Sequence, residues 1–395
     1  MCAPTRGPMA STVTVAYGDP TTIAHNEKDD DQPSCSGVRS AIEAAVTRDL
    51  TAKRREYLFT PPRWLQRCCL PALQDSRDEP VALLLCNIIL VTFPSALVVL
   101  LGPQRHWLGL IHVAVNYVLL FPRFVVALLH VTEHRRLFRS EYPFRNAIAS
   151  LMLTPLFGIP SGVYRLHHRV MHHVEDNMNP KDLSSTEPYQ RDNLAHFFMY
   201  WFRHATLAWL ELPIYALSCR RYKLTAEVVA AELMYGMTVF GMYQWRPVAT
   251  LWLFLIPYLL STLAMMFGNW CQHMFINPEN PRSAYSMAYN SVATGDNSAT
   301  FNDGYHILHH LNSMTHWSEL PVQFLKSLDR HIENKALVVD DWGVIEIGLA
   351  VFARDYDAVI NRMLLPYTKP KDAETREAAK QMLKARLRPV HVKAA

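Results

Sequence analysis

Residues 301–321 read FNDGYHILHHLNSMTHWSELP, and the interpretation of the whole chain begins with this stretch. Within it, His306, His309 and His310 form the pattern H-x-x-H-H. If the segment is helical, His306 and His310 lie one turn apart on one face, with His309 beside them. Imidazole is a good ligand for iron, zinc, copper and nickel. The stretch therefore predicts three histidines that bind a metal ion.

Two further histidine clusters occur earlier in the chain. We name them box one (His130 and His134, H-x-x-x-H) and box two (His168, His172 and His173, H-x-x-x-H-H), and the pattern quoted above is box three. Together the boxes hold eight of the 18 histidines of the chain. A zinc site uses three or four protein ligands. Eight clustered histidines are therefore too many for one zinc ion and are enough for two metal ions.

The composition predicts a membrane protein. Hydrophobic residues make up 50% of the 395 residues, charged residues only 19%, and the formal net charge is +4, so nothing points to nucleic acid as a partner. Runs of about 20 apolar residues are long enough to cross a bilayer. The sequence contains four candidate runs, which short polar links join into two hairpins: Val81–Leu101, Trp107–Leu129, Ala226–Tyr243 and Val248–Trp270.

The distribution of charge predicts that all three boxes face the cytosol. Four arginines follow the second apolar run (Arg135, Arg136, Arg139 and Arg145), whereas Arg105 stands alone in the link at its other end. Positive charge is enriched in cytosolic loops, so box one is expected there. Residues 147–163 are too short and too broken for a full span, which leaves box two on the same side. The second hairpin then returns the chain to that side before box three.

The apolar runs also divide the chain into three parts. Residues 1–62 lack a sustained apolar run and are predicted to form a disordered N-terminal tail, closed by a helix around Ser40–Tyr57. Residues 63–325 contain the apolar runs and the boxes, and are predicted to form a membrane-bound catalytic domain. Within it, residues 194–217 are expected to lie in the membrane interface. Residues 326–395 are predicted to form a cytosolic C-terminal helical region.

A ninth histidine and an asparagine join the set at the end of the last apolar run. His273 follows this run directly, and Asn269 lies four residues earlier on the same helical face. The ordered boxes, with paired apolar runs between boxes two and three, resemble the integral-membrane fatty acid desaturase/hydroxylase superfamily. The resemblance covers roughly Val81–Pro321, and acyl desaturases of this kind use a histidine and an asparagine at these two places.

This resemblance implies an all-α, multi-pass membrane protein with four transmembrane helices in two hairpins and a cytosolic helical cap that carries the metal site. It implies two iron ions, with an asparagine that contacts one of them through water. The residues that it assigns to the metal site are His130, His134, His168, His172, His173, His273, His306, His309, His310 and Asn269.

The resemblance also implies the reaction. Two irons activate O2, the co-substrate, and loss of two hydrogens from a fatty acyl lipid or acyl thioester gives a double bond, whereas return of oxygen to the carbon gives an alcohol. A lipid or alkyl hydroxylase is therefore the alternative. The sequence has no His-Pro-Gly-Gly haem motif, so a separate cytochrome b5 or ferredoxin is the expected electron donor. The endoplasmic reticulum is the expected membrane, with a plastid or bacterial inner membrane as alternatives.

Two functions of other classes also fit part of the sequence. Box one matches H-x-x-E-H, the inverted motif of zinc proteases, in which Glu133 would be the base. The two further boxes disfavour a protease, and Glu133 is then expected to support a ligand or to pair with nearby arginines. A metal transporter or sensor is the other alternative. Transport sites usually lie near the bilayer midplane, whereas the boxes lie at the ends of the spans.

Other polar residues near the boxes are expected to play other roles. His167 would point about 100° away from His168 on a helix, so it is not predicted to be a ligand. His316 lies beyond box three and is expected to cap a helix or to form hydrogen bonds. Asn302 and Asp303 precede box three and are expected to cap it or to support a ligand. Four more histidines are predicted not to be ligands: His106, His112, His196 and His204.

Overall fold

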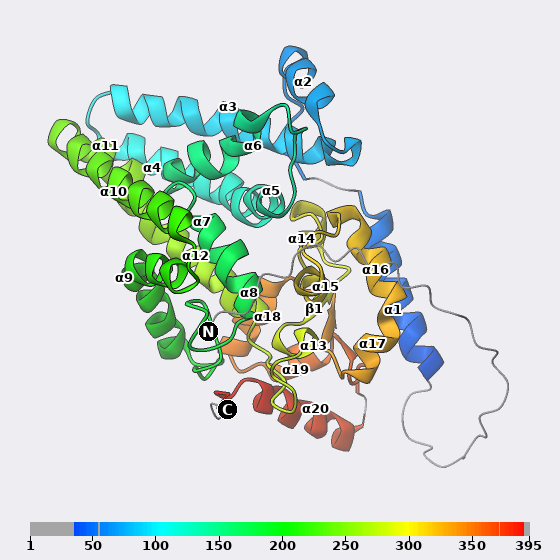
Figure 1. The fold of residues 1–395 in the computed structure, drawn as a ribbon. Helices are drawn as coiled ribbons and strands as arrows, with labels where there is room; N and C mark the ends of the chain where they lie inside the picture. The colour runs from blue at the N-terminus through cyan, green and yellow to red at the C-terminus, as the bar shows by residue number, and fades with distance from the viewer. Residues whose placement is uncertain (1–34, 54–55, 371, 391–395) are drawn as a thin grey trace.

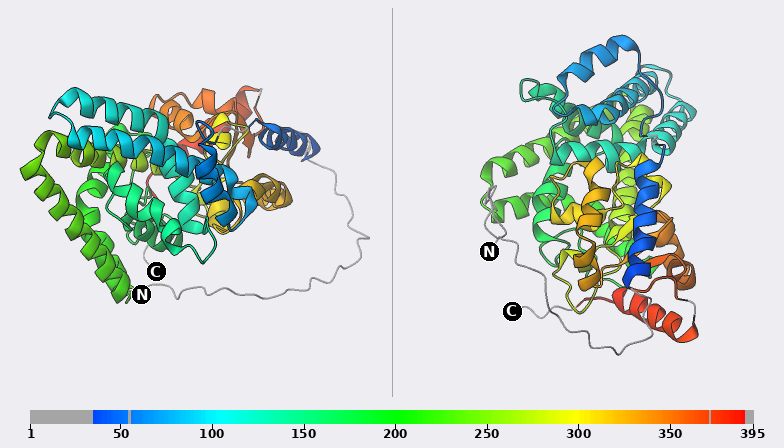
Figure 2. Two further views of the ribbon diagram at one scale, coloured as in Figure 1. Left: turned by 90° about the horizontal axis from the view of Figure 1, so that it is seen from above. Right: turned by 90° about the vertical axis from the view of Figure 1, so that its right-hand side faces the viewer.

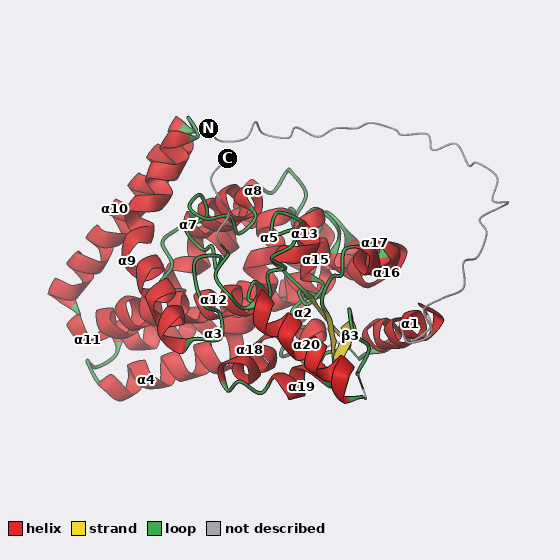
Figure 3. Cartoon of the chain, turned by 90° about the horizontal axis from the view of Figure 1, so that it is seen from below, coloured by secondary structure: helices red, strands yellow, loops and turns green. Residues whose placement is uncertain are grey.

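The computed structural model describes residues 35–53, 56–370 and 372–390 (Figure 1). The chain is mostly helical, with 69% helix and 3% strand. This agrees with the predicted helical class, apart from one small sheet that the sequence did not predict. Figure 3 shows how helices dominate the cartoon.

The first half of the described chain runs from α1 to box two. In the labels below, η marks a short 3₁₀- or π-helical segment. Its elements are α1 (Cys35–Thr51), α2 (Arg63–Cys69), η1 (Leu70–Ala72), η2 (Ser76–Asp78), α3 (Glu79–Leu101), α4 (His106–Val115), η3 (Asn116–Leu120), η4 (Arg123–Leu129), α5 (His130–His134), α6 (Pro143–Ala147), η5 (Ile148–Leu153), η6 (Thr154–Phe157), α7 (Val163–Arg165), η7 (Leu166–His172) and α8 (His173–Glu175).

The second half contains the remaining long helices and the small sheet. Its elements are α9 (Leu194–Ser218), α10 (Tyr222–Trp245), α11 (Pro247–Thr250), η8 (Leu251–Leu255), α12 (Ile256–Gln272), α13 (Ala284–Met287), β1 (Asn290–Val292), α14 (Gly295–Ala299), α15 (His306–Leu311), η9 (Trp317–Glu319), α16 (Leu320–Lys326), α17 (Leu328–Glu333), β2 (Val338–Asp340), α18 (Val344–Phe352), α19 (Tyr356–Ile360), β3 (Met363–Leu365) and α20 (Ala373–Arg386).

The described residues contain three or four candidate membrane spans, against four predicted. Three helical stretches are long and apolar enough to cross a bilayer: Ser76–Leu101, Tyr222–Trp245 and Pro247–Gln272. The fourth candidate is a pair of helices, His106–Leu120 and Arg123–His134, that meet at 48°. Pro122 stands at this bend, where its missing N–H and its ring weaken the helical hydrogen bonding.

The apolar helices gather on one side of the molecule. In Figures 1 and 2, α3, α4, α10 and α12 lie together there, while α13 to α20 and α1 occupy the other side. We refer to this second group of elements as the cap. α12 joins the two sides, because it packs against α9 and also against α18 of the cap. The segment predicted to lie in the interface is the long helix α9.

The sheet lies inside the cap and holds box three in place. β1 pairs in parallel with β2, which pairs antiparallel with β3, and every residue of the three strands is buried. Ser291 N of β1 donates a hydrogen bond to Gly304 O at 2.8 Å. Asn290 Oδ1 accepts one from Ile307 N at 3.0 Å, which satisfies a free N–H in the first turn of α15. The sheet therefore fixes where the helix of box three begins.

Helix α1 lies within the segment that the sequence predicted to be a tail. It packs against α16, and Ile42, Ala45 and Val46 are fully buried. Asp49 Oδ2 accepts hydrogen bonds from Ala293 N at 2.7 Å and from Tyr305 Oη at 2.7 Å. Part of the predicted tail therefore supports the approach to box three. Residues 1–34 and 54–55 of the predicted tail lie outside the described residues.

Gly304 lies in the loop that leads into box three, at a close contact with β1 and Asn297. A Cβ atom on this residue would stand 2.4 Å from Ser291 O and 2.4 Å from Asn297 Oδ1. The first of these atoms belongs to the backbone of β1 and cannot move without disturbing the sheet. A side chain at position 304 therefore pushes box three away from the strand that positions it.

We expect Gly304→Ala to lower the free energy of unfolding by about 1–3 kcal/mol, because the added methyl overpacks a buried contact. The measurement is thermal unfolding of the purified protein in detergent. Gly241→Ala is the matched control, because Gly241 lies in α10 with nothing within 4 Å of an added Cβ. Helix propensity predicts an unchanged or slightly higher melting temperature for the control. Equal melting temperatures for both variants would contradict the close contact.

Candidate metal centre

Four segments of the chain bring nine histidines together. Box one lies on α5, box two on η7 and α8, and box three on α15. His273 stands at the C-terminal end of α12. Because these segments are far apart in the sequence, the cluster exists only in the folded chain.

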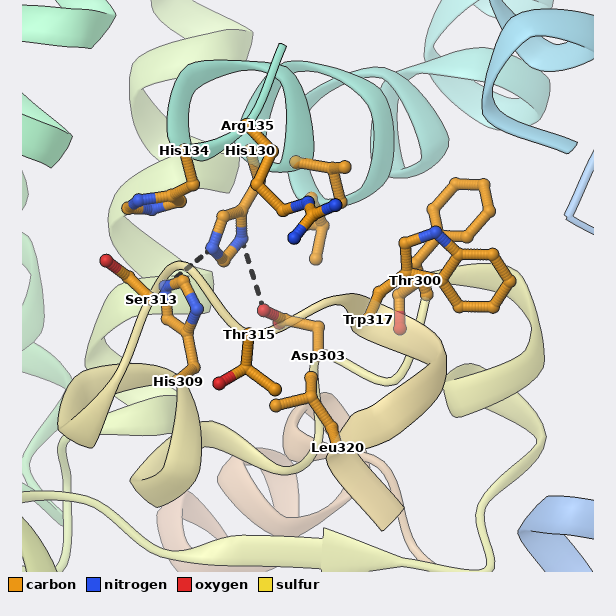
Figure 4. A pocket seen from close by; sticks show the side chains of 13 residues that line it. His130, His134, Arg135, Thr300, Asp303, His309, Ser313, Thr315, Trp317 and Leu320 are labelled. Atoms are coloured by element: carbon orange, nitrogen blue, oxygen red, sulfur yellow. Dashed lines mark hydrogen bonds and ion pairs between the residues drawn. The ribbon is translucent and has the colours of Figure 1, made fainter. Parts of the chain in front are cut away.

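The first group contains five histidines: His130, His134, His168, His173 and His309. One ring nitrogen from each lies within 4.8 Å of those of the other four. The Nε2 atoms of His130 and His309 are 2.7 Å apart, and those of His309 and His173 are 2.8 Å apart. Figure 4 shows His130, His134 and His309 pointing toward one another from α5 and α15.

The second group contains the other four histidines. Ring nitrogens of His172, His273 and His310 lie within 4.8 Å of one another. His306 Nε2 is 3.2 Å from His273 Nε2, and the centroid of its ring is 4.8 Å from that of His310. The structure therefore brings together all nine histidines that the sequence singled out, five in one group and four in the other.

Box two is shared between the two groups. Its backbone is π-helical in η7, up to His172, and α-helical in α8, from His173. His168 and His173 lie in the first group, with their Nε2 atoms 3.3 Å apart. His172 belongs to the second group, although the centroid of its ring is also 5.9 Å from that of His168. One short motif therefore contributes ligands to both groups.

The distances within the groups fit metal ligation. Two imidazole nitrogens bound to one ion at about 2.1 Å and at right angles lie about 3 Å apart, close to the distances of 2.7–3.3 Å found here. Without an ion, one proton satisfies a facing pair of ring nitrogens, but it cannot satisfy five nitrogens that converge within 4.8 Å of one another. In the described part of the chain both ring nitrogens of His310 lack a hydrogen bond although they are buried.

Burial keeps several of these rings neutral. Desolvation, and then the neighbouring imidazoles, hold the pKa values of several cluster histidines well below the ordinary value: His168, His173, His306, His309 and His310. Burial lowers the pKa of His273 to about 3. Neutral imidazole is the form that binds a metal ion. The donor set therefore suits a pair of transition-metal ions.

Two carboxylates lie beside the Nδ1 atoms of the histidine rings. Asp182 Oδ2 lies 2.7 Å from His172 Nδ1. Asp303 Oδ1 lies 3.2 Å from His130 Nδ1 and 3.9 Å from His306 Nδ1, so one carboxylate reaches both groups. Such partners fix the ring orientation and the tautomer, so that Nε2 faces the metal. The expected supporting role of Asp303 agrees with this geometry.

A cavity of about 490 Å³ adjoins the cluster. Its walls include the cluster residues His130, His168, His172 and His306. Apolar residues of η4 and α12 line another part, among them Val125, Met265 and Phe267. The volume lies within the range of pockets that hold small ligands. An alkyl chain in this cavity would lie beside the histidines.

Comparison with known sequences identifies the family. The sequence model described as fatty acid desaturase matches residues 105–329, more than half of the chain. The chain belongs to the fatty acid desaturase family. Comparison with curated proteins and with solved structures finds no match. The matched region of this desaturase-family chain contains all three boxes and His273.

Several residues that the sequence analysis considered lie outside the two groups. In the desaturase-family chain the Glu133 carboxylate lies 4.0 Å from Arg165 Nε and belongs to neither group, which agrees with the expected pairing with a nearby arginine. The ring of His167 packs against His204, with centroids 4.9 Å apart. His316 caps η9 by accepting a hydrogen bond from Ser318 N.

Asn269 lies beside the second group. Its Nδ2 donates hydrogen bonds to Ser184 O at 3.0 Å and to Tyr200 Oη at 2.8 Å. Ser184 in turn donates from Oγ to Asp182, the carboxylate behind His172. Asn269 thus belongs to the network that supports the histidines, and it lines the cavity. Asp182 could not be predicted from the sequence, because no spacing relates it to box two.

We expect His309→Ala to bind about half as much metal as the unmodified protein, because His309 touches two other rings of the five-histidine group. The measurement is metal per chain by mass spectrometry after purification. His106→Ala is the matched control, since His106 is an exposed residue outside both groups. Full metal retention in His309→Ala would contradict the assignment of this group.

Proposed function

We propose that this desaturase-family chain is a membrane oxidoreductase that inserts a double bond into a fatty acyl chain, with O2 and external electrons. The observation that carries the proposal is the position of the nine-histidine cluster beside a 490 Å³ cavity with apolar walls. A fatty acyl lipid or acyl thioester is the substrate. The cavity holds its alkyl chain, and the cluster lies beside one stretch of it.

The nine histidines are proposed to hold two iron ions, one in each group. Bound iron supplies the one-electron redox chemistry that O2 activation requires. The protein holds the rings in fixed orientations, with Asp182 behind the second group and Asp303 behind both. Asn269 is proposed to approach one iron through water, and its bonds to Ser184 and Tyr200 hold its side chain in place.

The cavity walls are proposed to select the carbon that reacts. Positioning a substrate within reach of the reactive centre can account for much of an enzyme's rate enhancement. Phe121 and Val125 of the bent membrane segment lie on one wall, and Met265 and Phe267 of α12 line another part. These side chains exclude water and restrict how an alkyl chain passes the histidines. A hydroxylase would use the same residues, so the product distinguishes the two reactions.

The remaining parts of the proposal concern the membrane. We place the protein in the endoplasmic reticulum, with two transmembrane hairpins and with the metal site in a cytosolic cap. The four arginines that follow box one support this orientation. A separate cytochrome b5 or ferredoxin is proposed as the electron donor, and it must reach the cap from the cytosol.

We expect cells that express the chain to accumulate new unsaturated acyl lipids. The lipids of cells that express His306→Ala should match those of untransformed cells, because this variant lacks a ligand of the second group. Mass spectrometry of total lipids is the measurement, and His196→Ala is the control, since His196 instead accepts a hydrogen bond from Gln190 N. New hydroxylated lipids would favour the alternative. If cells that express the unmodified chain contain neither new unsaturated lipids nor new hydroxylated lipids, the result would contradict the proposed function.

The orientation leads to a separate expectation. We consider a flexible insert with an N-glycosylation acceptor, placed directly after Gly102 in the link between the first two apolar runs. It should be glycosylated in a eukaryotic host, because the proposed orientation puts this link on the lumenal side. The same insert after Arg388 should remain unmodified. A gel-mobility shift that endoglycosidase reverses is the measurement. The opposite pattern would overturn the cytosolic placement of the cap.

A further inference from the structure

The cavity beside the histidines has two chemically different parts. Its membrane side is lined by apolar residues of η4 and α12. Its cap side is lined by β1, α14, the loop before box three and the start of α18, which contribute polar side chains: Ser291, Thr294, Asp296, Asn297, Thr300 and Glu346. A ligand that fills this cavity must have an apolar chain and a polar head.

Two carboxylates meet in the polar part. A Cβ atom on Gly343 would stand within 2.7 Å of Glu346 Oε2 and still closer to the carboxylate of Asp296. Both acidic side chains therefore lie against Gly343, in space that a larger residue at this position would fill. Asp296 and Glu346 are also exposed residues, so this end of the cavity opens to solvent.

No positive charge balances the two carboxylates. Among the residues that line the cavity, none is a lysine or an arginine. In the described part of the chain neither Asp296 nor Glu346 forms an ion pair within 4.0 Å. Although Asp296 as a whole residue is exposed, its carboxylate is partly desolvated, and this, followed by the carboxylates of Glu346 and Asp303, raises the pKa of Asp296. The polar part is therefore a region of uncompensated negative charge.

Apart from Thr294, whose hydroxyl accepts from Asp296 N, the other polar groups of this part already donate hydrogen bonds within the protein. Asn297 Nδ2 donates to Asp49 Oδ2 at 3.0 Å and to Ser291 O at 3.1 Å. Thr300 Oγ1 donates to Asp296 O at 2.8 Å. Ser291 Oγ donates to Trp342 O. A head group that enters here consequently meets the carboxylate oxygens of Asp296 and Glu346 as its main free partners, and both of them are acceptors.

We propose that the cavity takes a long-chain lipid whose polar head is a primary ammonium group, with Asp296 and Glu346 as its partners. This inference rests on the proposed function and names the substrate class of the same site. An ammonium donates up to three hydrogen bonds and carries the charge that the carboxylates lack. A phosphate or a carboxylate head would face like charge at close range and would meet no positive partner among the residues that line the cavity.

The position of the head also fixes which part of the chain reaches the histidines. The polar part and the histidine cluster line one continuous cavity. Asp303 and Gly304 also line it, and they precede His306 by three and two residues in the sequence. An ammonium held at Asp296 and Glu346 therefore anchors the substrate at the cap end. The alkyl chain then extends past the histidines toward the apolar walls, so that carbons near the head lie closest to the cluster.

The test measures binding and needs no turnover. The full-length protein in lipid nanodiscs is titrated with octadecylamine, octadecanol and octadecyl phosphate, which share one alkyl chain. We expect octadecylamine to bind at least ten-fold more tightly than octadecyl phosphate. The double variant Asp296→Asn with Glu346→Gln should weaken amine binding at least five-fold. Glu346→Lys should reverse the order of amine and phosphate.

The control removes two carboxylates of the cap that do not line the cavity, with Glu374→Gln and Glu377→Gln together on α20. It should leave the amine affinity within two-fold of the unmodified protein. Tighter binding of the phosphate, equal binding of all three probes, or an unchanged amine affinity in the double variant would overturn the inference. Those outcomes leave the desaturase proposal standing, because that proposal is judged by metal content and by lipid products.

Discussion

Nitrogen atoms of neighbouring imidazoles approach one another to 2.7–3.3 Å inside this protein, and the rest of the structure depends on this crowding. Burial keeps the rings neutral, so no proton can satisfy every facing lone pair. A metal ion between the rings removes that cost, because it accepts several lone pairs at once. The four segments therefore offer two groups of neutral nitrogen ligands, each suited to one metal ion.

The two sides of the molecule contribute to this centre in different ways. The membrane helices supply His273, at the end of α12, and box one, at the end of a bent apolar pair. The cap supplies box three, whose entry is fixed by β1, by Gly304 and by Asp49 of α1. Since the cavity lies between the two sides, an alkyl chain held by the apolar walls and a head group held by the cap can bind at the same time.

The histidine boxes were predictable because their information is local. Spacings of three or four residues place side chains on one helical face, and apolar runs of about 20 residues indicate candidate spans directly. The sheet was not predicted because each strand has only three residues and its partners are distant in the sequence. Asp182 and Asp49 were not predicted because their roles arise from tertiary contact. The division of box two between the groups is also a property of the folded chain, and the spacing of its histidines does not reveal it.

The proposed function requires two iron ions, one held by each group of histidines. X-ray absorption at the iron edge of the purified, unmodified protein measures both the number of irons and their ligands. We expect about two irons per chain, nearest-neighbour scattering dominated by imidazole nitrogen, and four to five histidines at each iron. A protein that contains zinc only, or one iron per chain, or iron with mainly oxygen or sulfur ligands, would rule out the two-iron site.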